Sequence, residues 1–368
     1  MKITILGAGN MGCANAADLT LKGHEVTLVK TSHSMHNETF NYVCAHNNEI
    51  TLWQEGEEQT ARIHAVTTDL SSVATADLVY ITTQTNVHEQ LIQRIAPLLR
   101  KGQVVLISPG YFSTAYFLRH CPDKDLTIIE GESSTIDCRV DDTGFVRVGF
   151  RNVRNPVGVY PVENLPKVRD MLESMQFHYV YLSSVVEAAL HNPNMMVHTV
   201  GAVMSIPRIE KTKGDYCMYW EVWTPSVYRI LDQLDKEKMD VLEHLGYERL
   251  NYFDACKYRN SLDDSIDARA VFEEYAASPY RAKGPVVVDS RYISEDVPQG
   301  LVMLESLGRH LSIPTPVCTA LIEHRLRRTG PRPAGRGPLH RAPGRGEHPE
   351  GLCQLPPHVL IYELPDPH

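Results

Sequence analysis

The sequence predicts an α/β fold: a Rossmann-type domain with a doubly wound sheet, followed by a mostly α-helical second domain. Two observations support this prediction. Short apolar runs alternate with helical patterns in the first half of the 368-residue chain, which is typical of a parallel sheet with helices on both faces. Helical patterns dominate from about Ser184 onward. Since a chain of this length usually forms two domains, we expect one over residues 1–183 and another over residues 184–323.

The elements of the first domain are expected in a regular order along the chain. The predicted strands are short apolar runs at 2–6, 24–30, 77–83, 103–108 and 126–130, with three further candidates that would extend the same sheet at 145–151, 157–161 and 179–183. The helical patterns between them lie at 10–21, 87–100 and 113–119. The second domain is expected to consist of helices at 184–206, 225–245, 250–258, 265–276 and 298–311.

The C-terminal segment 324–368 differs from the rest of the chain in composition. It contains nine of the 23 prolines, together with Arg, Gly and His, and it lacks apolar periodicity. We therefore expect a disordered or poorly packed tail. A helical pattern breaks off abruptly after Glu323, as a change of reading frame would produce; resequencing of the coding DNA tests that hypothesis.

Charge and composition exclude several classes of protein. The chain has 36 Lys and Arg against 45 Asp and Glu, a net charge of −9, which argues against nucleic acid or an anionic membrane as the main partner. No run approaches the roughly 20 apolar residues that cross a bilayer, and the run Ile3–Leu6 is too short for a secretory signal. The eight cysteines are scattered without a CxxC pair, which indicates reduced thiols and no zinc site. A cytoplasmic protein without a metal is expected.

A GxGxxG motif directly follows the first predicted strand and begins the first predicted helix. It consists of Gly7, Ala8, Gly9, Asn10, Met11 and Gly12. In this context Gly7 permits the tight turn, Gly9 lets the backbone approach a pyrophosphate, and Gly12 allows the helix to pack closely on the strand. The free N–H groups and partial positive charge of the helix N-terminus favour the phosphates. The motif predicts a bound nicotinamide or related dinucleotide; the alternative is a glycine-rich turn without a ligand.

The end of the second strand should set the choice between NAD(H) and NADP(H). An acidic residue there would accept a ribose 2′-hydroxyl and repel a 2′-phosphate. The sequence instead has Lys30, Thr31 and Ser32, which favours NADP(H) over NAD(H), although Lys30 could also be a solvated strand end. Thr83 with Gln84 and Ser108 with Pro109 follow later strands and are further candidates for cofactor contact; ordinary turn chemistry is the alternative for each.

The helical half contains two groups of residues with chemical potential. Asn194 and His198 are four positions apart and so lie on one face of a helix, where the amide could position a substrate beside an imidazole suited to proton transfer at pH 7. A structural histidine is the alternative. In the stretch 289–298, Arg291 could hold a carboxylate in a bidentate manner, and Asp296 could orient a histidine ring. The alternative there is a surface turn with an acidic helix N-cap.

Several stretches together resemble the opine dehydrogenase family, which includes the octopine and nopaline dehydrogenases and the bacterial carboxyethyl-norvaline type. They are GAGNMG at 7–12, NPNMMVH at 192–198, YWEVWTPSV at 219–227 and RYISEDVPQGLVMLESLGRHLSIPTP at 291–316. The last is long and specific, whereas GxGxxG alone occurs in many families. ISPGY at 107–111 and the pair Cys138-Arg139 add to the resemblance, which covers residues 1–323.

The resemblance implies a function and a set of site residues. Family members condense an amino acid with a 2-oxo acid and reduce the resulting imine with NAD(P)H. The family's catalytic His falls on His198 and its partner Asp on Asp296, while Arg291 and Asn194 match positions of the active-site region. Trp220 and Thr224 are candidate pocket residues, although aromatic residues on helices more often belong to the core. The residues after the second strand depart from the family pattern, which leaves the cofactor preference open. The segment from 324 also departs from it, which leaves the assembly open; a homodimer is one option.

Two other classes are compatible with a similar plan. Ketopantoate-reductase-like and polyol-phosphate-dehydrogenase-like enzymes usually carry a catalytic lysine on the first helix of the second domain, but residues 168–210 contain no lysine. A non-catalytic redox sensor would bind the dinucleotide without chemistry, and it would have no need for His198 and Asp296 together.

Overall fold

The computed structural model describes residues 1–32, 34–277 and 284–328. Its contacts divide the chain into two compact units. The N-terminal unit comprises Met1–Asn192 together with Ala255–Ser265, and the helical unit comprises Pro193–Asp254 and the described residues from Ile266 onward. The division falls after Asn192, whereas we expected it after Ser183, because the helix that follows Ser183 packs on strands of the N-terminal unit.

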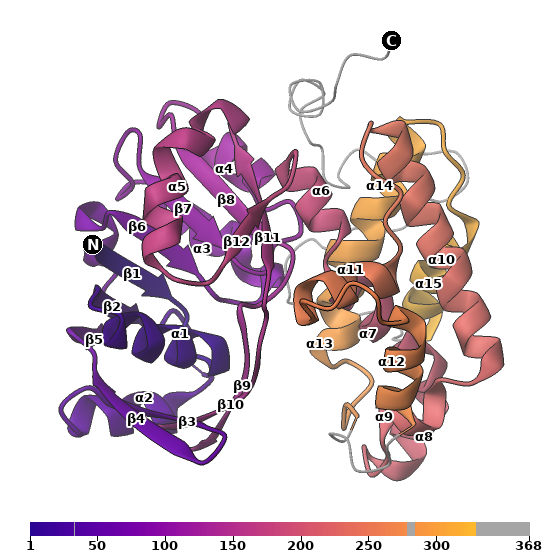
Figure 1. Ribbon diagram of the computed structural model, residues 1–368, viewed down its shortest axis with the longest axis horizontal. Coiled ribbons are helices and arrows are strands. Elements are labelled where there is room, and N and C mark those ends of the chain that lie inside the picture. The colour runs from indigo at the N-terminus through magenta and orange to yellow at the C-terminus, as the bar shows by residue number, and fades with distance from the viewer. Residues whose placement is uncertain (33, 278–283, 329–368) are drawn as a thin grey trace. The chain divides into compact units, whose positions relative to one another are not determined.

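An eight-stranded sheet forms the centre of the N-terminal unit (Figure 1). Its strands are, along the chain, β1 (Lys2–Leu6), β2 (Glu25–Val29), β5 (Ala65–Thr67), β6 (Leu78–Ile81), β7 (Val104–Ile107), β8 (Thr127–Gly131), β11 (Asn155–Tyr160) and β12 (Tyr179–Tyr181). Their order across the sheet is β12-β11-β8-β7-β6-β1-β2-β5. All neighbours are parallel except β8 and β11. The Rossmann-type doubly wound sheet that the alternating pattern predicts is confirmed, but the sheet is mixed and not wholly parallel.

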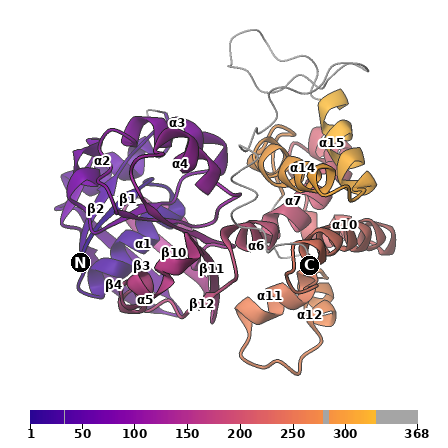
Figure 2. The ribbon, with the colours of Figure 1, turned by 90° about the horizontal axis from the view of Figure 1, so that it is seen from above.

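Helices cover both faces of this sheet. They are α1 (Asn10–Leu21), α2 (Asn37–Ala45), α3 (His88–Ile95), α4 (Thr114–His120), α5 (Leu165–Ser174) and α6 (Val185–Leu190). Ile3 and Ile5 of β1 pack with α1 and α5, whereas Leu6 points to the other face and packs with α3 and α4. Figure 2 shows these two pairs of helices on opposite sides of the strands. Successive side chains of a strand alternate between faces, so one short apolar run serves both cores.

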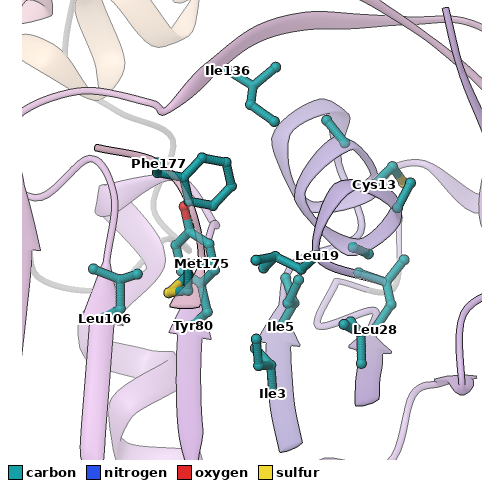
Figure 3. Packing of buried hydrophobic residues seen from close by; sticks show 14 of the residues in the cluster. Ile3, Ile5, Cys13, Leu19, Leu28, Tyr80, Leu106, Ile136, Met175 and Phe177 are labelled. Carbon is teal, nitrogen blue, oxygen red and sulfur yellow. The ribbon is translucent and has the colours of Figure 1, made fainter. Parts of the chain in front are cut away.

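The larger of these cores is shown from close by in Figure 3, where Ile3 and Ile5 meet Leu19 of α1, Tyr80 of β6 and Met175. Each of these five side chains is at most 1% exposed. Full burial of a side chain of this size contributes about 1.5–3 kcal/mol. The core therefore anchors the strand that leads directly into the glycine turn.

A second, four-stranded sheet corrects the prediction for residues 145–151. This segment, β10 (Phe145–Arg151), does not extend the main sheet; it pairs with β9 (Ile136–Asp142) and with β3 (Glu49–Gln54), which in turn pairs with β4 (Glu57–Arg62). The strands β9 and β10 have alternating buried and exposed residues. That pattern suits a sheet with one solvated face, and so distinguishes β10 from the strands of the main sheet.

The helical unit is built around α7 (Pro193–Met204). It packs against α8 (Ile206–Thr212), α9 (Met218–Val222), α10 (Pro225–His244), α13 (Arg291–Ser294) and α15 (Pro316–Arg328). The unit also contains α12 (Ala268–Ala276) and α14 (Val302–His310), and α11 (Tyr252–Asn260) crosses the division between the two units. The expected helical second domain is confirmed.

Three further differences from the sequence predictions concern helices. The expected helix 184–206 is interrupted between α6 and α7, because Pro193 has no N–H and restricts the residue before it. The helix expected at 250–258 was assigned to the second domain, but the residues of α11 from Ala255 onward belong to the N-terminal unit. The helix α15 continues to Arg328, past the position where a tail was predicted; residues 329–368 of that predicted tail lie outside the described residues.

Candidate active site

The glycine turn between β1 and α1 has the geometry of a phosphate-binding loop. Gly7 has a φ of +122°, which L side chains rarely adopt. A Cβ on Gly12 would lie 1.7 Å from the carbonyl oxygen of Gly7, whereas a Cβ on Gly9 would have no atom closer than 3.4 Å, at His36. Gly7 and Gly12 are therefore required by the fold itself. Gly9 is not, and its missing side chain leaves the backbone accessible to a ligand.

The N-terminus of α1 is free to bind an anion. Gly9 is its N-cap and provides no side-chain hydrogen bond, and the first turn contains no acidic residue. Unsatisfied N–H groups and the partial positive charge of the helix face whatever lies there. Asn10 is an exception among the motif residues, because its side-chain oxygen accepts a hydrogen bond from Val140 N at 3.0 Å. The residues present thus fit the pyrophosphate of a dinucleotide.

The residues after β2 are arranged differently from the simplest expectation. Lys30 is 7% exposed, and its ammonium group donates to the carbonyl of Ser32 and lies 5.8 Å from the Phe40 ring centroid. Two other side chains are relevant: Arg94 donates to the carbonyl of Thr31 at 3.2 Å, and the exposed His36 lies nearest to the position that a Cβ on Gly9 would occupy. Sequence reasoning missed both; Arg94 lies 63 positions from Thr31, so no local pattern connects the two.

The ends of β6 and β7 lie as parallel topology requires. A Cβ on Gly7 would lie 3.0 Å from Thr83 Cγ2, so Thr83 is beside the glycine turn, and Gln84 follows it as the N-cap of a short 3-10 helix. The Ser108 hydroxyl donates to the carbonyl of Ser133 at 2.6 Å. Among the described residues Ser108 thus has a structural partner, while the half-buried Pro109 follows it at the strand end.

Two buried ionisable groups hold these loops in place. His88 on α3 contacts the carbonyl of Thr83 through Nε2 at 3.0 Å and the Ser113 hydroxyl through Nδ1 at 2.7 Å. Glu130 on β8 accepts from both the backbone N–H and the hydroxyl of Thr114 at 2.6 Å. Burial lowers the pKa of His88 to about 4 and raises the pKa of Glu130 to about 6. These groups were not among the sequence candidates.

In the helical unit, His198 and Asp296 form a buried pair. His198 Nδ1 and Asp296 Oδ2 are 3.0 Å apart, and the two side chains are 10% and 3% exposed. His198 lies in the middle of α7, and Asp296 follows α13 at the start of a short π-helical turn. An aspartate at Nδ1 holds the proton there and leaves Nε2 available to a reacting group. No other hydrogen bond to this imidazole is found within the part of the chain that the structure describes.

Two residues adjoin this pair through α13. The Tyr292 ring stacks on the His198 imidazole, with centroids 3.8 Å apart and an interplanar angle of 14°. Arg291 is exposed, and its guanidinium carbon lies 5.7 Å from the centroid of the Tyr292 ring. Within the described residues Arg291 forms no ion pair. Sequence reasoning selected Arg291 and Asp296 but missed Tyr292, whose only signal is its place beside Arg291.

The remaining candidates are less closely associated with this pair. Asn194 is half-buried one turn before His198 on α7. Trp220 is 51% exposed and lines a pocket of about 520 Å³ with Trp223 and Tyr228. Neither His198 nor Asp296 is among the residues that line this pocket. Thr224 is exposed at the N-cap of α10 and does not use its hydroxyl to cap that helix.

Among the described residues, no group of three or more His, Cys, Asp or Glu side chains is arranged to hold a metal ion. No helix of that part of the chain combines the length and apolar character needed to cross a bilayer.

The two parts of the chain match different protein-family models. Residues 181–325 match the family model described as NAD/NADP octopine/nopaline dehydrogenase, alpha-helical domain. Residues 3–111 match the model described as ketopantoate reductase PanE/ApbA. The chain is 28% identical over 328 residues to an opine dehydrogenase of Arthrobacter sp. (strain 1C), which covers 87% of this chain and 88% of that protein.

Solved structures agree with the fold. An octopine dehydrogenase in complex with NADH and agmatine has a TM-score of 0.71 at 16% identity, with 90% of each chain covered. A yersinopine dehydrogenase with bound NADP⁺ has a TM-score of 0.67 at 16% identity, covering 89% of this chain and 90% of that one.

The glycine turn, the doubly wound sheet and the helical second unit define a nicotinamide-dependent oxidoreductase. The match to the ketopantoate reductase model is confined to the dinucleotide-binding part. The helical part matches the octopine/nopaline dehydrogenase model, and the similarity to an opine dehydrogenase extends over most of the chain.

Proposed function

We propose that this protein is an NAD(P)H-dependent opine dehydrogenase, which joins the amino group of an amino acid to a 2-oxo acid and reduces the resulting imine to a secondary amine. One observation carries the proposal: His198 and Asp296 form a buried 3.0 Å hydrogen bond within the segment that matches the octopine/nopaline dehydrogenase model. A proton-transfer group supported in this way is what imine chemistry requires near neutral pH.

The chain's own residues would handle the protons of this reaction. Condensation forms a carbinolamine, which loses its hydroxyl as water to give the imine. As an imidazolium, His198 would donate its Nε2 proton to that leaving hydroxyl, and Asp296 would stabilise the imidazolium before this transfer by accepting the hydrogen bond from Nδ1. A nicotinamide cofactor, when bound, would supply the hydride that reduces the imine carbon. Asp296 also restricts the ring to one tautomer, so the same nitrogen faces the substrate at each step.

Substrate carboxylates require cations, and we propose Arg291 for this role, with Asn194, Trp220 and Thr224 as further pocket residues. Arg291 is exposed and has no ion-pair partner among the described residues, so its planar guanidinium is available for a bidentate contact. Arg291→Ala should raise KM for the 2-oxo acid about tenfold or more with a smaller change in kcat, consistent with a lost charge-assisted contact. Arg249→Ala, which removes a surface ion pair with Asp240, is the control. An unchanged KM in Arg291→Ala refutes the assignment.

We also propose that NADP(H) is preferred over NAD(H). Lys30 was expected to supply the positive charge, but its ammonium group already bonds the Ser32 carbonyl. Arg94 contacts the Thr31 carbonyl after β2, and His36 lies beside Gly9 of the glycine turn, so these two side chains are better placed to meet a 2′-phosphate. No acidic side chain occurs at positions 30–32 to repel that phosphate.

Arg94→Gln tests the cofactor proposal. The variant should raise the Kd for NADPH about tenfold or more while changing the Kd for NADH less than about threefold, since only the former has the extra phosphate. Arg119→Gln, on the neighbouring helix and paired with Glu89, is the matched control. Equal affinities of the unaltered protein for NADH and NADPH contradict the preference.

The proposed activity is tested by oxidation of NADPH and NADH in the presence of pyruvate and a panel of amino acids. Turnover should require both the oxo acid and an amino acid. His198→Ala should abolish most turnover while leaving cofactor affinity, measured by fluorescence titration, nearly unchanged. Reduction of the oxo acid alone would indicate a ketopantoate-reductase-like enzyme. Tight cofactor binding without turnover for any pair would indicate a redox sensor.

The cytoplasmic location and a homodimer stay predictions. The thiols in the described part of the chain are all free, which suits a reducing compartment. Size-exclusion chromatography with light scattering, with and without cofactor, determines the assembly.

A further inference from the structure

We propose that Tyr292 is a positioning residue for His198, which holds the plane of the imidazole and thereby aims Nε2 at the substrate. The inference rests on the proposed function and adds to it a residue outside the His–Asp pair. It follows from the stacked geometry of the two rings, with centroids 3.8 Å apart and planes within 14° of each other.

The hydrogen bond to Asp296 does not by itself fix the imidazole. It holds Nδ1 at 3.0 Å from a carboxylate oxygen, but a ring anchored at one atom can still turn about that contact, because terminal ring torsions are broad. Rotation of the ring would swing Nε2 away from any single direction. A flat neighbour at van der Waals distance removes this freedom, since tilting the imidazole would drive it into the phenol ring.

Tyr292 is itself well supported. It is half-buried and packs against the apolar cluster of Ile209, Tyr216, Met218 and Val222 on one side, and near Ile293 in a second small cluster. It belongs to the short helix α13, which packs on α7. The stack thus connects His198 to the rigid part of the helical unit and does not depend on a flexible surface side chain.

The phenol face also suits the charge that His198 carries during the reaction. An aromatic face is negative, so it attracts a cation placed over it. When His198 holds two protons, the stack and Asp296 act together on the imidazolium. The ring is also 5.7 Å from the Arg291 guanidinium carbon, so one side chain lies against both the proposed proton donor and the proposed carboxylate clamp.

Substitution at position 292 separates stacking from other roles. Tyr292→Leu keeps an apolar side chain for the cluster but loses the flat ring, and we expect kcat to fall about tenfold, equivalent to about 1.4 kcal/mol, with KM for both substrates within about twofold. Tyr292→Phe keeps the ring and should restore kcat. Tyr219→Leu is the matched control: Tyr219 is a half-buried tyrosine on the same cluster, but its ring contacts are with Phe272 and Tyr275.

A second measurement reports on the stack without catalysis. Ring protons of a histidine over a tyrosine face resonate upfield in NMR spectra, and the His198 signals are identified by their loss in His198→Gln. They should be upfield in the unaltered protein and in Tyr292→Phe, and should move downfield in Tyr292→Leu. Shifted signals with an unchanged kcat in Tyr292→Leu, or no rescue by Phe, overturn the positioning role while the proposed function stands. No turnover by the unaltered protein with any substrate pair overturns both, even if the shifts show the stack.

Discussion

At the scale of single residues, the neighbours of His198 decide what an ordinary imidazole can do. The side chain is 10% exposed, its Nδ1 is bonded to Asp296, and one face is covered by Tyr292. Among the described residues Nε2 has no hydrogen-bond partner, so it remains for a reacting group. Burial strengthens the contact with Asp296, because a hydrogen bond to a charged group is stronger in a low dielectric. The proposed proton transfer therefore depends on three residues acting as one unit.

Asp296→Asn tests the contribution of charge in this unit. The amide is the same size as the carboxylate but favours the opposite tautomer and cannot stabilise the imidazolium. We expect kcat to fall about 100-fold or more, since loss of such an orienting carboxylate costs about 10- to 10⁴-fold in related arrangements. Steady-state kinetics measure the effect, and circular dichroism confirms the fold. A kcat within about threefold of the unaltered enzyme would remove Asp296 from the mechanism.

At the scale of elements, two glycines of the β1–α1 turn differ in role: we expect Gly12 to be required for folding and Gly9 for cofactor binding. Gly12→Ala would place a methyl group 1.7 Å from a backbone oxygen, and backbone cannot yield as a side chain can. We expect a loss of at least about 3 kcal/mol of stability, at the upper end for overpacking. Gly9→Ala meets only the tip of His36, at 3.4 Å.

Gly9→Ala is therefore expected to fold normally but to bind the cofactor at least about tenfold more weakly, because the new methyl group occupies the space that the pyrophosphate needs. Thermal unfolding and fluorescence titration measure the two effects for both variants. Normal cofactor affinity in Gly9→Ala would show that the dinucleotide does not bind at this turn.

The loops after β6 and β7 depend on two buried groups whose pH effects have opposite signs. His88 is held neutral, with its pKa lowered from 6.5 to about 4, so its contribution to stability is lost as the pH falls through that range. Glu130 has its pKa raised from 4.5 to about 6, so its contribution is present at low pH and is lost as the pH rises through that range. The two changes partly cancel in the unaltered protein.

Removing one group should reveal the other. In Glu130→Gln, the free energy of unfolding should rise by about 3 kcal/mol as the pH increases from 4 to 6.5, because in this range His88 is protonated only in the unfolded chain. In His88→Gln, stability should fall by about 2 kcal/mol between pH 4.5 and 6. Urea unfolding at a series of pH values measures both, with the exposed Glu163→Gln as control. Parallel pH profiles for the two variants would contradict this account.

At the scale of the whole molecule, a segment from the later sequence completes the N-terminal unit. Ala255–Ser265 belongs to that unit, and Arg259 holds it there. The Arg259 guanidinium pairs with Glu132 at 2.8 Å, with the side chains 4% and 3% exposed, and its carbonyl accepts from the backbone N–H groups of Val153 and Arg154. The dinucleotide-binding unit is therefore not a contiguous stretch of chain.

Arg259→Met should destabilise the N-terminal unit by about 3 kcal/mol or more, because it leaves the Glu132 carboxylate buried without its partner. Denaturant unfolding, monitored through the release of bound cofactor, measures the change in the free energy of unfolding. Lys236→Met breaks an exposed pair with Asp240 and should cost less than about 1 kcal/mol. Equal effects of the two substitutions would show that the buried pair does not anchor the segment.

Prediction from sequence was successful where the physical signal is local. The helix Asn10–Leu21 has the predicted bounds, and the strands predicted for the main sheet up to residue 131 match those observed within a few residues, because alternation, glycine position and apolar runs act over short distances. The short edge strand β5 was not predicted. The hairpin β3–β4 was not predicted. In its turn, Glu55 and Gly56 both have positive φ, as a tight hairpin turn requires. The strand β10 was assigned to the wrong sheet, since pairing partners are not encoded in one strand alone.

From the sequence alone one can predict a dinucleotide-binding turn, a helical second unit and candidate residues in the patterns of one enzyme family. The packed structure was needed to find that Tyr292 stacks on His198, that Lys30 bonds the Ser32 carbonyl, and that residues 255–265 complete the N-terminal unit. The two kinds of feature differ in how far apart along the chain the interacting residues are. A turn or a helix depends on neighbours a few positions away, whereas the His198–Asp296 contact joins residues 98 positions apart, and such contacts exist only once the elements have packed.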